Sequence, residues 1–265
     1  MSASSPPGAR RSRPVVANWK MYGDRRMLAA WGQALEERLG ASPPAPVVVC
    51  PPFPYLLLFA GARRFALGAQ DVADEEDGAY TGCVSAAMLR DCGCRYVIVG
   101  HSERRTCQGE RDPLIARKVA RALAAGLRPI VCLGESQAER DAGRTEEVLL
   151  RALEAVLDTL GPPGAESPEL HLAYEPLWAI GSGRPAGPED VASVHALLRR
   201  RLRAHDAKMA DRTPILYGGS VRAPQARELR ALEDVDGLLV GGASRDVDEF
   251  HAICRAWHDR EWPQD

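Results

Sequence analysis

The stretch YVIVGHSERR, residues 96–105, joins four apolar or aromatic residues to a glycine and then to an imidazole, a carboxylate and two guanidinium groups. The run 96–100 is short and almost continuously apolar, which is typical of a strand covered on both faces of a parallel sheet. The polar residues begin where this strand ends. This stretch therefore predicts a buried strand that delivers titratable side chains at its carboxyl end.

The same unit recurs along the chain. Eight short, mostly apolar segments are predicted strands: 14–18, 46–50, 66–70, 96–100, 128–132, 170–175, 214–218 and 237–241. The stretches between them carry apolar residues at helical spacing, as in 149–160 and 191–202. Eight strands alternating with helices, at roughly thirty residues per unit, predict a parallel (β/α)8 barrel of the α/β class. A doubly wound open sheet is the alternative, and it is disfavoured because no GxGxxG follows the first strand.

The domain organisation follows from the same pattern. No linker rich in proline or serine breaks the middle of the chain, so residues 14–265 are expected to form a single barrel domain. Residues 1–13 are expected to be a flexible extension, because they are polar and lack the apolar core of a secretion signal.

Composition excludes several functional classes. The net charge is −2, from 34 Lys and Arg against 36 Asp and Glu, which does not suggest a nucleic-acid partner, although a local basic patch can attract a small anion. No apolar run is long enough for a membrane span. Seven scattered cysteines, an odd number, indicate reduced thiols and a cytoplasmic location. Cys92-Gly93-Cys94 lacks the paired spacing of a zinc site, and we expect neither a metal nor a cofactor.

Chemistry in such a barrel lies on the loops that follow the strands. Asn18 and Lys20 follow the first predicted strand, His101 and Glu103 follow the fourth, and Glu175 ends the sixth. Each residue alone is more often a surface charge, a helix cap or an ion-pair partner, but all five are predicted to meet at one mouth. A carboxylate can remove a proton from a carbon next to a carbonyl, and imidazole or ammonium donors can stabilise the resulting enediolate.

Two glycine pairs are predicted at the same mouth. Gly218-Gly219 ends the seventh predicted strand, and Gly241-Gly242 follows the eighth and precedes a helix expected near Ser244. Without a Cβ, the backbone can approach an anion closely and present its N–H groups. Loops after these two strands hold a phosphate in many barrels. No P-loop pattern is present, so a nucleoside triphosphate is not expected.

Six motifs resemble those of the triosephosphate isomerase family. They are NWKM (18–21), GHSERR (100–105), CLGE (132–135), AYEPLWAIGSG (173–183), YGGSV (217–221) and LLVGGAS (238–244). The similarity runs from about Pro14 to about Trp257, with the motifs in the family's order and on the expected elements.

The resemblance implies a role for each matching residue. Glu175 would be the base that moves a proton between two carbons, and His101 the neutral electrophile that polarises the carbonyl. Lys20 would supply positive charge, Asn18 would orient the substrate, and Glu103 would be a second acid close to Lys20.

The resemblance also implies a phosphate site and a mobile lid. The backbone N–H groups that would hold the phosphate belong to Gly181, Ser220, Gly241 and Gly242. Pro176-Leu177-Trp178 resembles the first hinge of the lid, and residues 181–186 resemble its tip and second hinge. Tyr217, together with Ser220, resembles the latch of the closed lid.

The chain departs from the family pattern at a few positions. Tyr22 stands where the family commonly has Asn, Cys83 where it commonly has Glu, Asp71 where Asn is frequent, and Ser182 where Thr is usual. The family is typically dimeric through the loop at about Asp74–Cys83, so a homodimer is expected, with interface details altered at Cys83.

The expected function is interconversion of D-glyceraldehyde 3-phosphate and dihydroxyacetone phosphate, a glycolytic and gluconeogenic reaction that needs no cofactor. Three alternatives stay open. The same mechanism could act on a four-carbon ketose phosphate, the barrel could bind a phosphate without catalysis, or Lys20 could form a Schiff base as in an aldolase.

Overall fold

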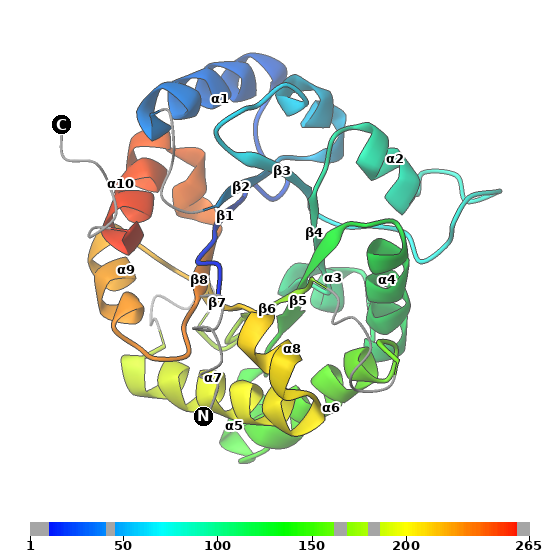
Figure 1. The fold of residues 1–265 in the computed structure, drawn as a ribbon, viewed down its shortest axis with the longest axis vertical. Helices are drawn as coiled ribbons and strands as arrows, with labels where there is room; N and C mark the ends of the chain where they lie inside the picture. Colours follow the sequence, from blue (N-terminus) through cyan, green and yellow to red (C-terminus); the bar gives the residue numbers. More distant parts are fainter. Residues whose placement is uncertain (1–10, 41–45, 162–168, 180–185, 259–265) are drawn as a thin grey trace, which may run out of the picture.

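The computed structural model describes residues 11–40, 46–161, 169–179 and 186–258. Its centre is a closed barrel of eight parallel strands that follow one another around the ring in chain order (Figure 1). The strands are β1 (Val15–Asn18), β2 (Val47–Cys50), β3 (Ala66–Ala69), β4 (Tyr96–Val99), β5 (Arg128–Leu133), β6 (His171–Tyr174), β7 (Ile215–Gly219) and β8 (Gly237–Val240). The predicted (β/α)8 barrel is confirmed.

Helices form a ring outside the strands (Figure 1). The α-helices of the described residues are α1 (Arg25–Leu39), α2 (Ala86–Asp91), α3 (Ser102–Cys107), α4 (Asp112–Ala124), α5 (Gln137–Asp141), α6 (Thr145–Leu157), α7 (Pro188–His205), α8 (Ala207–Arg212), α9 (Ala223–Arg230) and α10 (Val247–His258). Two 3₁₀ turns, η1 (Phe53–Phe59) and η2 (Gly242–Arg245), complete the elements. None of the described helices combines the length and apolarity needed to cross a bilayer.

Strand pairing closes the barrel between its first and last strands. Val16 of β1 lies opposite Val48 of β2 on one side and Leu239 of β8 on the other. All strands are parallel, so their carboxyl ends meet at one end of the barrel and their amino ends at the other.

The core has two layers because side chains alternate along each strand. Val16, Ile98, Ile130 and other inward-pointing residues fill the barrel interior. The residues between them, such as Val15 and Val97, point outward and pack against the helices. All seven cysteines are free thiols, and Cys132 belongs to the inner layer.

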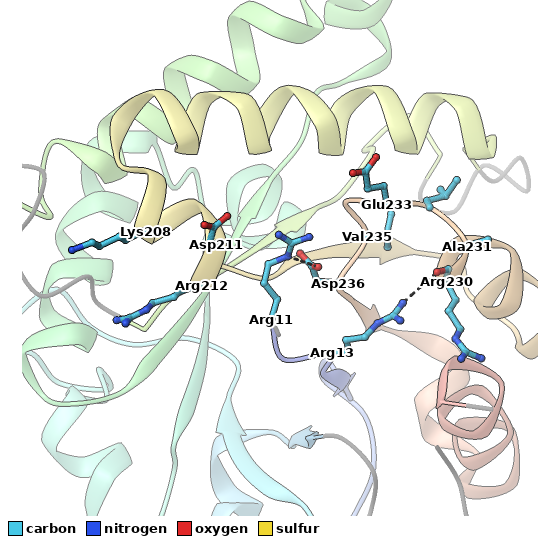
Figure 2. A pocket seen from close by; sticks show the side chains of 11 residues that line it. Arg11, Arg13, Lys208, Asp211, Arg212, Arg230, Ala231, Glu233, Val235 and Asp236 are labelled. Atoms are coloured by element: carbon cyan, nitrogen blue, oxygen red, sulfur yellow. Dashed lines mark hydrogen bonds and ion pairs between the residues drawn. The ribbon is translucent and has the colours of Figure 1, made fainter. Parts of the chain in front are cut away.

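Residues just before β1 lie at the amino end of the barrel (Figure 2). The Arg11 side chain donates from Nε to Asp236 Oδ1 at 2.7 Å, and the carbonyl of Arg13 accepts from Trp257 Nε1 at 3.3 Å. The division between an extension and the barrel at residue 14 remains a prediction.

Candidate active site

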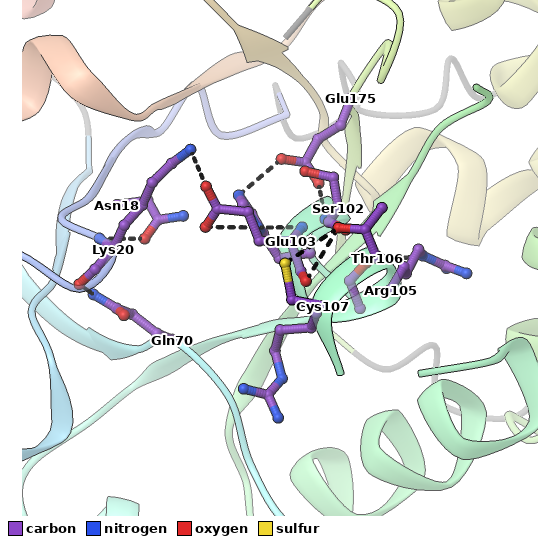
Figure 3. A network of polar contacts seen from close by, with 12 residues as sticks. Asn18, Lys20, Gln70, Ser102, Glu103, Arg105, Thr106, Cys107 and Glu175 are labelled. Carbon is purple, nitrogen blue, oxygen red and sulfur yellow. Dashed lines mark hydrogen bonds and ion pairs between the residues drawn. The ribbon is translucent and has the colours of Figure 1, made fainter. Parts of the chain in front are cut away.

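The predicted site residues gather at the carboxyl end of the barrel. A small cavity there is lined by Asn18, Lys20, His101, Glu175, Gly218, Gly219, Leu239 and Gly241. The polar side chains come from the ends of three strands far apart in the sequence, and Glu103 joins them through Lys20 (Figure 3). The carboxyl ends of the strands therefore bring together all five side chains expected to carry chemistry.

Glu175 is the residue directly after β6, and its backbone N–H still bonds to Leu133 O of the neighbouring strand β5 at 2.7 Å. Its side chain is only 4% exposed. Oε2 accepts from the Ser102 N–H at 2.9 Å, and Oε1 lies 3.0 Å from His101 Nε2. Burial alone would raise the pKa of Glu175, but His101, the Ser102 N–H and the Cys132 thiol outweigh it, so the pKa lies below its usual value. The carboxyl group is therefore ionised at neutral pH.

His101 is the N-cap of α3, and its Nδ1 accepts from the Glu103 N–H at 3.2 Å. Because Nδ1 is an acceptor, the neutral ring carries its proton on Nε2 and directs it at Glu175. Burial lowers the pKa of His101, but the Glu175 and Glu103 carboxylates raise it by more, and it lies above its usual value. Protonation at Nδ1 would break the bond from the Glu103 N–H, which opposes the charged form.

Lys20 has φ +52°, the one positive φ of a non-glycine residue in the described part of the chain. Such a conformation costs of order 1 kcal/mol and persists only where its surroundings hold it. Asn18 Oδ1 accepts from the Lys20 N–H at 3.0 Å, and Gln70 Nε2 donates to Lys20 O at 2.9 Å. The bent backbone places Nζ 2.6 Å from Glu103 Oε1 (Figure 3).

One glycine of each pair lies where a larger residue would disturb these side chains. A Cβ on Gly218 would come within 2.8 Å of Glu175 Cγ, and a Cβ on Gly241 within 3.2 Å of Lys20 Cε. Gly242 and Ser220 are exposed at the same end of the barrel. Gly181, the fourth predicted phosphate contact, lies outside the described residues, as does Ser182.

Comparison with known proteins agrees with this geometry. A sequence model of the family described as triosephosphate isomerase matches residues 13–257. The chain belongs to the triosephosphate isomerase family. A triosephosphate isomerase of Halorhodospira halophila is 50% identical over 249 residues, covering 93% of this chain and 98% of that protein. One from Alcanivorax borkumensis is 49% identical over 248 residues, with 93% and 98% covered, and one from Alkalilimnicola ehrlichii is 51% identical over 252 residues, with 92% and 98% covered.

In this member of the triosephosphate isomerase family, a buried carboxylate anchors the segment expected to be the first lid hinge. Glu135 Oε1 accepts from Trp178 Nε1 at 2.9 Å and from the Tyr174 hydroxyl at 3.1 Å, and its carbonyl accepts from the Leu177 N–H at 3.1 Å. Arg140 stacks on the Trp178 ring at 4.2 Å. Residues 180–185 lie outside the described part of the chain.

Tyr217, the predicted latch, is almost fully buried in the middle of β7. Its hydroxyl lies 2.5 Å from the position that a Cβ on Gly219 would take, so the glycine leaves room for it. Burial raises the pKa of Tyr217 to about 12, and the phenol stays protonated and able to donate.

Two of the residues that depart from the family pattern, Tyr22 and Asp71, form contacts in the structure. The ring of Tyr22 lies beneath the guanidinium of Arg245, 4.2 Å from its centre. Asp71 accepts from Lys118 Nζ at 2.7 Å and from Arg104 Nη2 at 2.8 Å. Because Arg104 belongs to α3, Asp71 helps to hold the helix that begins with the donors to Glu175. Cys83 is exposed.

Sequence reasoning did not single out three of the groups that support the site. These are Gln70, Glu135 and the Ser102 N–H. Gln70 ends the third predicted strand and Glu135 ends the CLGE motif, but nothing in the sequence assigned either residue a role. Their partners are set by the closure of the barrel, which sequence spacing alone does not give.

Proposed function

We propose that this chain interconverts D-glyceraldehyde 3-phosphate and dihydroxyacetone phosphate by proton transfer through an enediolate, without a cofactor. The observation that carries the proposal is an ionised Glu175 carboxylate 3.0 Å from the Nε2 of His101, in a cavity that Lys20 also lines. Family membership and about 50% identity to triosephosphate isomerases over 93% of the chain support the same reaction.

Glu175 is the proposed base. It takes the proton from the substrate carbon next to the carbonyl and returns it to the neighbouring carbon, so that aldehyde and ketone exchange places. In the present structure this carboxylate is held by Ser102 and His101. Movement of the carboxylate toward a substrate would also release the His101 Nε2–H, which then donates to the substrate oxygens where negative charge develops.

The remaining side chains provide charge and position. Lys20 supplies positive charge for the anionic substrate and the enediolate, and its bent backbone is held by Asn18 and Gln70. Asn18 lines the same cavity and orients the substrate. Glu103 fixes the Lys20 ammonium through their 2.6 Å contact.

The phosphate group is assigned to backbone N–H groups at the same end of the barrel. The contributing residues are Gly181, Ser220, Gly241 and Gly242. Closure of the segment after Glu175, hinged at 176–178 and latched by Tyr217, would exclude water and protect the intermediate.

A coupled assay on the purified protein tests the proposal. Turnover of both triose phosphates should be fast, and Glu175→Asp, which withdraws the carboxylate by one methylene, should slow it by about 100-fold or more with the fold intact. Comparison of kcat/KM for triose and tetrulose phosphates distinguishes the two isomerase functions. Unimpaired turnover by Glu175→Asp would refute the base, and phosphate binding without turnover would favour the non-catalytic barrel.

We further propose that the protein works as a cytoplasmic homodimer and that residues 14–265 form its single domain. Exposed apolar side chains at Met21, Tyr22, Tyr80 and Met88 support an interface. Sedimentation should show a dimer, and alkylation of the exposed Cys83 should weaken it. Cell fractionation checks the compartment, and removal of residues 1–10 should leave the activity intact.

A further inference from the structure

The end of the barrel opposite the candidate active site carries a cavity of about 640 Å³. It is lined by residues that precede β1 and β8, by residues of α8 and by Arg230 at the end of α9 (Figure 2). Five of the lining side chains are cationic and three are carboxylates. The cations are Arg11, Arg13, Lys208, Arg212 and Arg230. We call this the basic cavity.

The carboxylates of the basic cavity are largely used by other cations. Asp236 receives Arg11 Nε on Oδ1 at 2.7 Å and the buried Arg199 Nη2 on Oδ2 at 2.5 Å. Asp211 faces Arg203 at 3.5 Å. Among the described lining residues, Glu233 is the one carboxylate left to offset the four cations other than Arg11.

Three of the cations have no such compensation. Within the described part of the chain, the side chains of Lys208, Arg212 and Arg230 form no hydrogen bond and no ion pair. Arg13 lies against the Trp257 ring at 4.7 Å, with Nη2 donating to Arg230 O at 3.3 Å.

The neighbouring His258 responds to this charge. The pKa of His258 is lowered to about 4. Burial is the largest cause, and the positive charges of Arg13 and Arg230 contribute to the same shift. The geometry of the cavity and this effect agree that the amino end of the barrel is locally electropositive, although the chain as a whole carries −2.

We propose that the basic cavity binds a small polyphosphate anion, such as pyrophosphate or tripolyphosphate. The cations stand on two sides, with Lys208 and Arg212 on α8 and Arg13 and Arg230 toward α9 (Figure 2). A ligand with negative charge at both ends can engage both sides, whereas a single phosphate can engage only one. Guanidinium groups match phosphate oxygens in a fork of two hydrogen bonds, and the volume suits a small ligand.

Hydrogen–deuterium exchange of the full chain with tripolyphosphate tests this assignment. We expect protection in segments 207–213 and 228–237, which the active-site loops do not include. The double variant Arg212→Gln with Arg230→Gln should bind at this end at least about tenfold more weakly, since each loses a charge-assisted contact. Arg117→Gln, an exposed arginine on α4 outside the cavity, is the matched control and should bind as the parent does.

The comparison anions complete the test. Inorganic phosphate should protect these segments only at much higher concentration than tripolyphosphate, and citrate should be weaker as well. Absence of protection, equal binding by the double variant, or equal binding of inorganic phosphate would each overturn the proposal. Lys208→Gln with Arg212→Gln, both exposed, serves if the first double variant does not fold. Hydrogen–deuterium exchange does not measure isomerase activity. A chain that lacked that activity could therefore still confirm or refute binding at the basic cavity.

Discussion

Gly134 is the position where one added carbon should disturb catalysis most. It follows β5 and lies beneath the backbone of Glu175. A Cβ built there would come 1.8 Å from Glu175 O and 2.6 Å from Leu177 Cδ1. The first of these atoms is backbone and has no rotamer by which to move aside. Gly134→Ala should therefore force the backbone of Glu175, the proposed base, away from residue 134.

The size of the effect follows from the overlap. Because ordinary contacts of a Cβ begin near 3.4 Å, residue 134 and the backbone of Glu175 must separate by about 1.6 Å. A smaller separation would leave strain in the packed structure. A misplacement of about 1 Å can cost about 100-fold in rate, or about 2.7 kcal/mol of transition-state stabilisation. Overpacking destabilises the fold by about 1–3 kcal/mol. We expect kcat to fall about 100-fold while the protein still folds.

Steady-state kinetics in the coupled assay and urea unfolding measure the two quantities separately. Gly61→Ala is the matched control, because a Cβ at Gly61 meets nothing within 4 Å. A kcat for Gly134→Ala within about twofold of the Gly61→Ala value would refute the reasoning that Glu175 depends on this close backbone approach.

Three further outcomes are expected. Burial lowers the pKa of His195 to about 4, so below pH 6.5 the unfolded chain binds a proton that the folded chain excludes. Urea unfolding at pH 7 and 5 should show a loss of stability to which His195 contributes on the order of 2 kcal/mol, and His195→Asn should reduce the loss by that amount while the contribution of the buried His258 remains. Glu103→Gln should lower kcat/KM by loosening Lys20, yet change stability by less than about 1 kcal/mol because Glu103 is half exposed. Asp71→Ala should destabilise the protein by about 3 kcal/mol, as calorimetry would show, because it leaves the buried Lys118 ammonium with only one of its two carboxylates.

The strands were predictable because their signal is local. The predicted range 96–100 became Tyr96–Val99, and 214–218 became Ile215–Gly219. Eight such segments leave few ways to cover both faces of a parallel sheet, which is why the barrel followed from the pattern. The convergence of Lys20, His101 and Glu175 then followed from the rule that strand ends meet at one end.

Other features depended on contacts that no local pattern encodes. Glu135 bonds Trp178 43 residues away, and Gln70 reaches Lys20 across 50 residues. The basic cavity draws on Arg11 and Arg230, from nearly opposite ends of the chain. Such groups look like ordinary surface charges or strand-end polar residues until the ring closes.

The proposed proton transfer by Glu175 can be followed directly by NMR of dihydroxyacetone phosphate incubated with the enzyme in D₂O. The account predicts that the parent enzyme forms D-glyceraldehyde 3-phosphate with deuterium at the carbon that receives the proton, because a carboxyl proton exchanges with solvent. It also predicts that Glu175→Gln, which cannot accept the proton, forms neither labelled nor unlabelled product at a comparable rate. Isomerisation and deuterium uptake by Glu175→Gln at the parent rate would contradict the account.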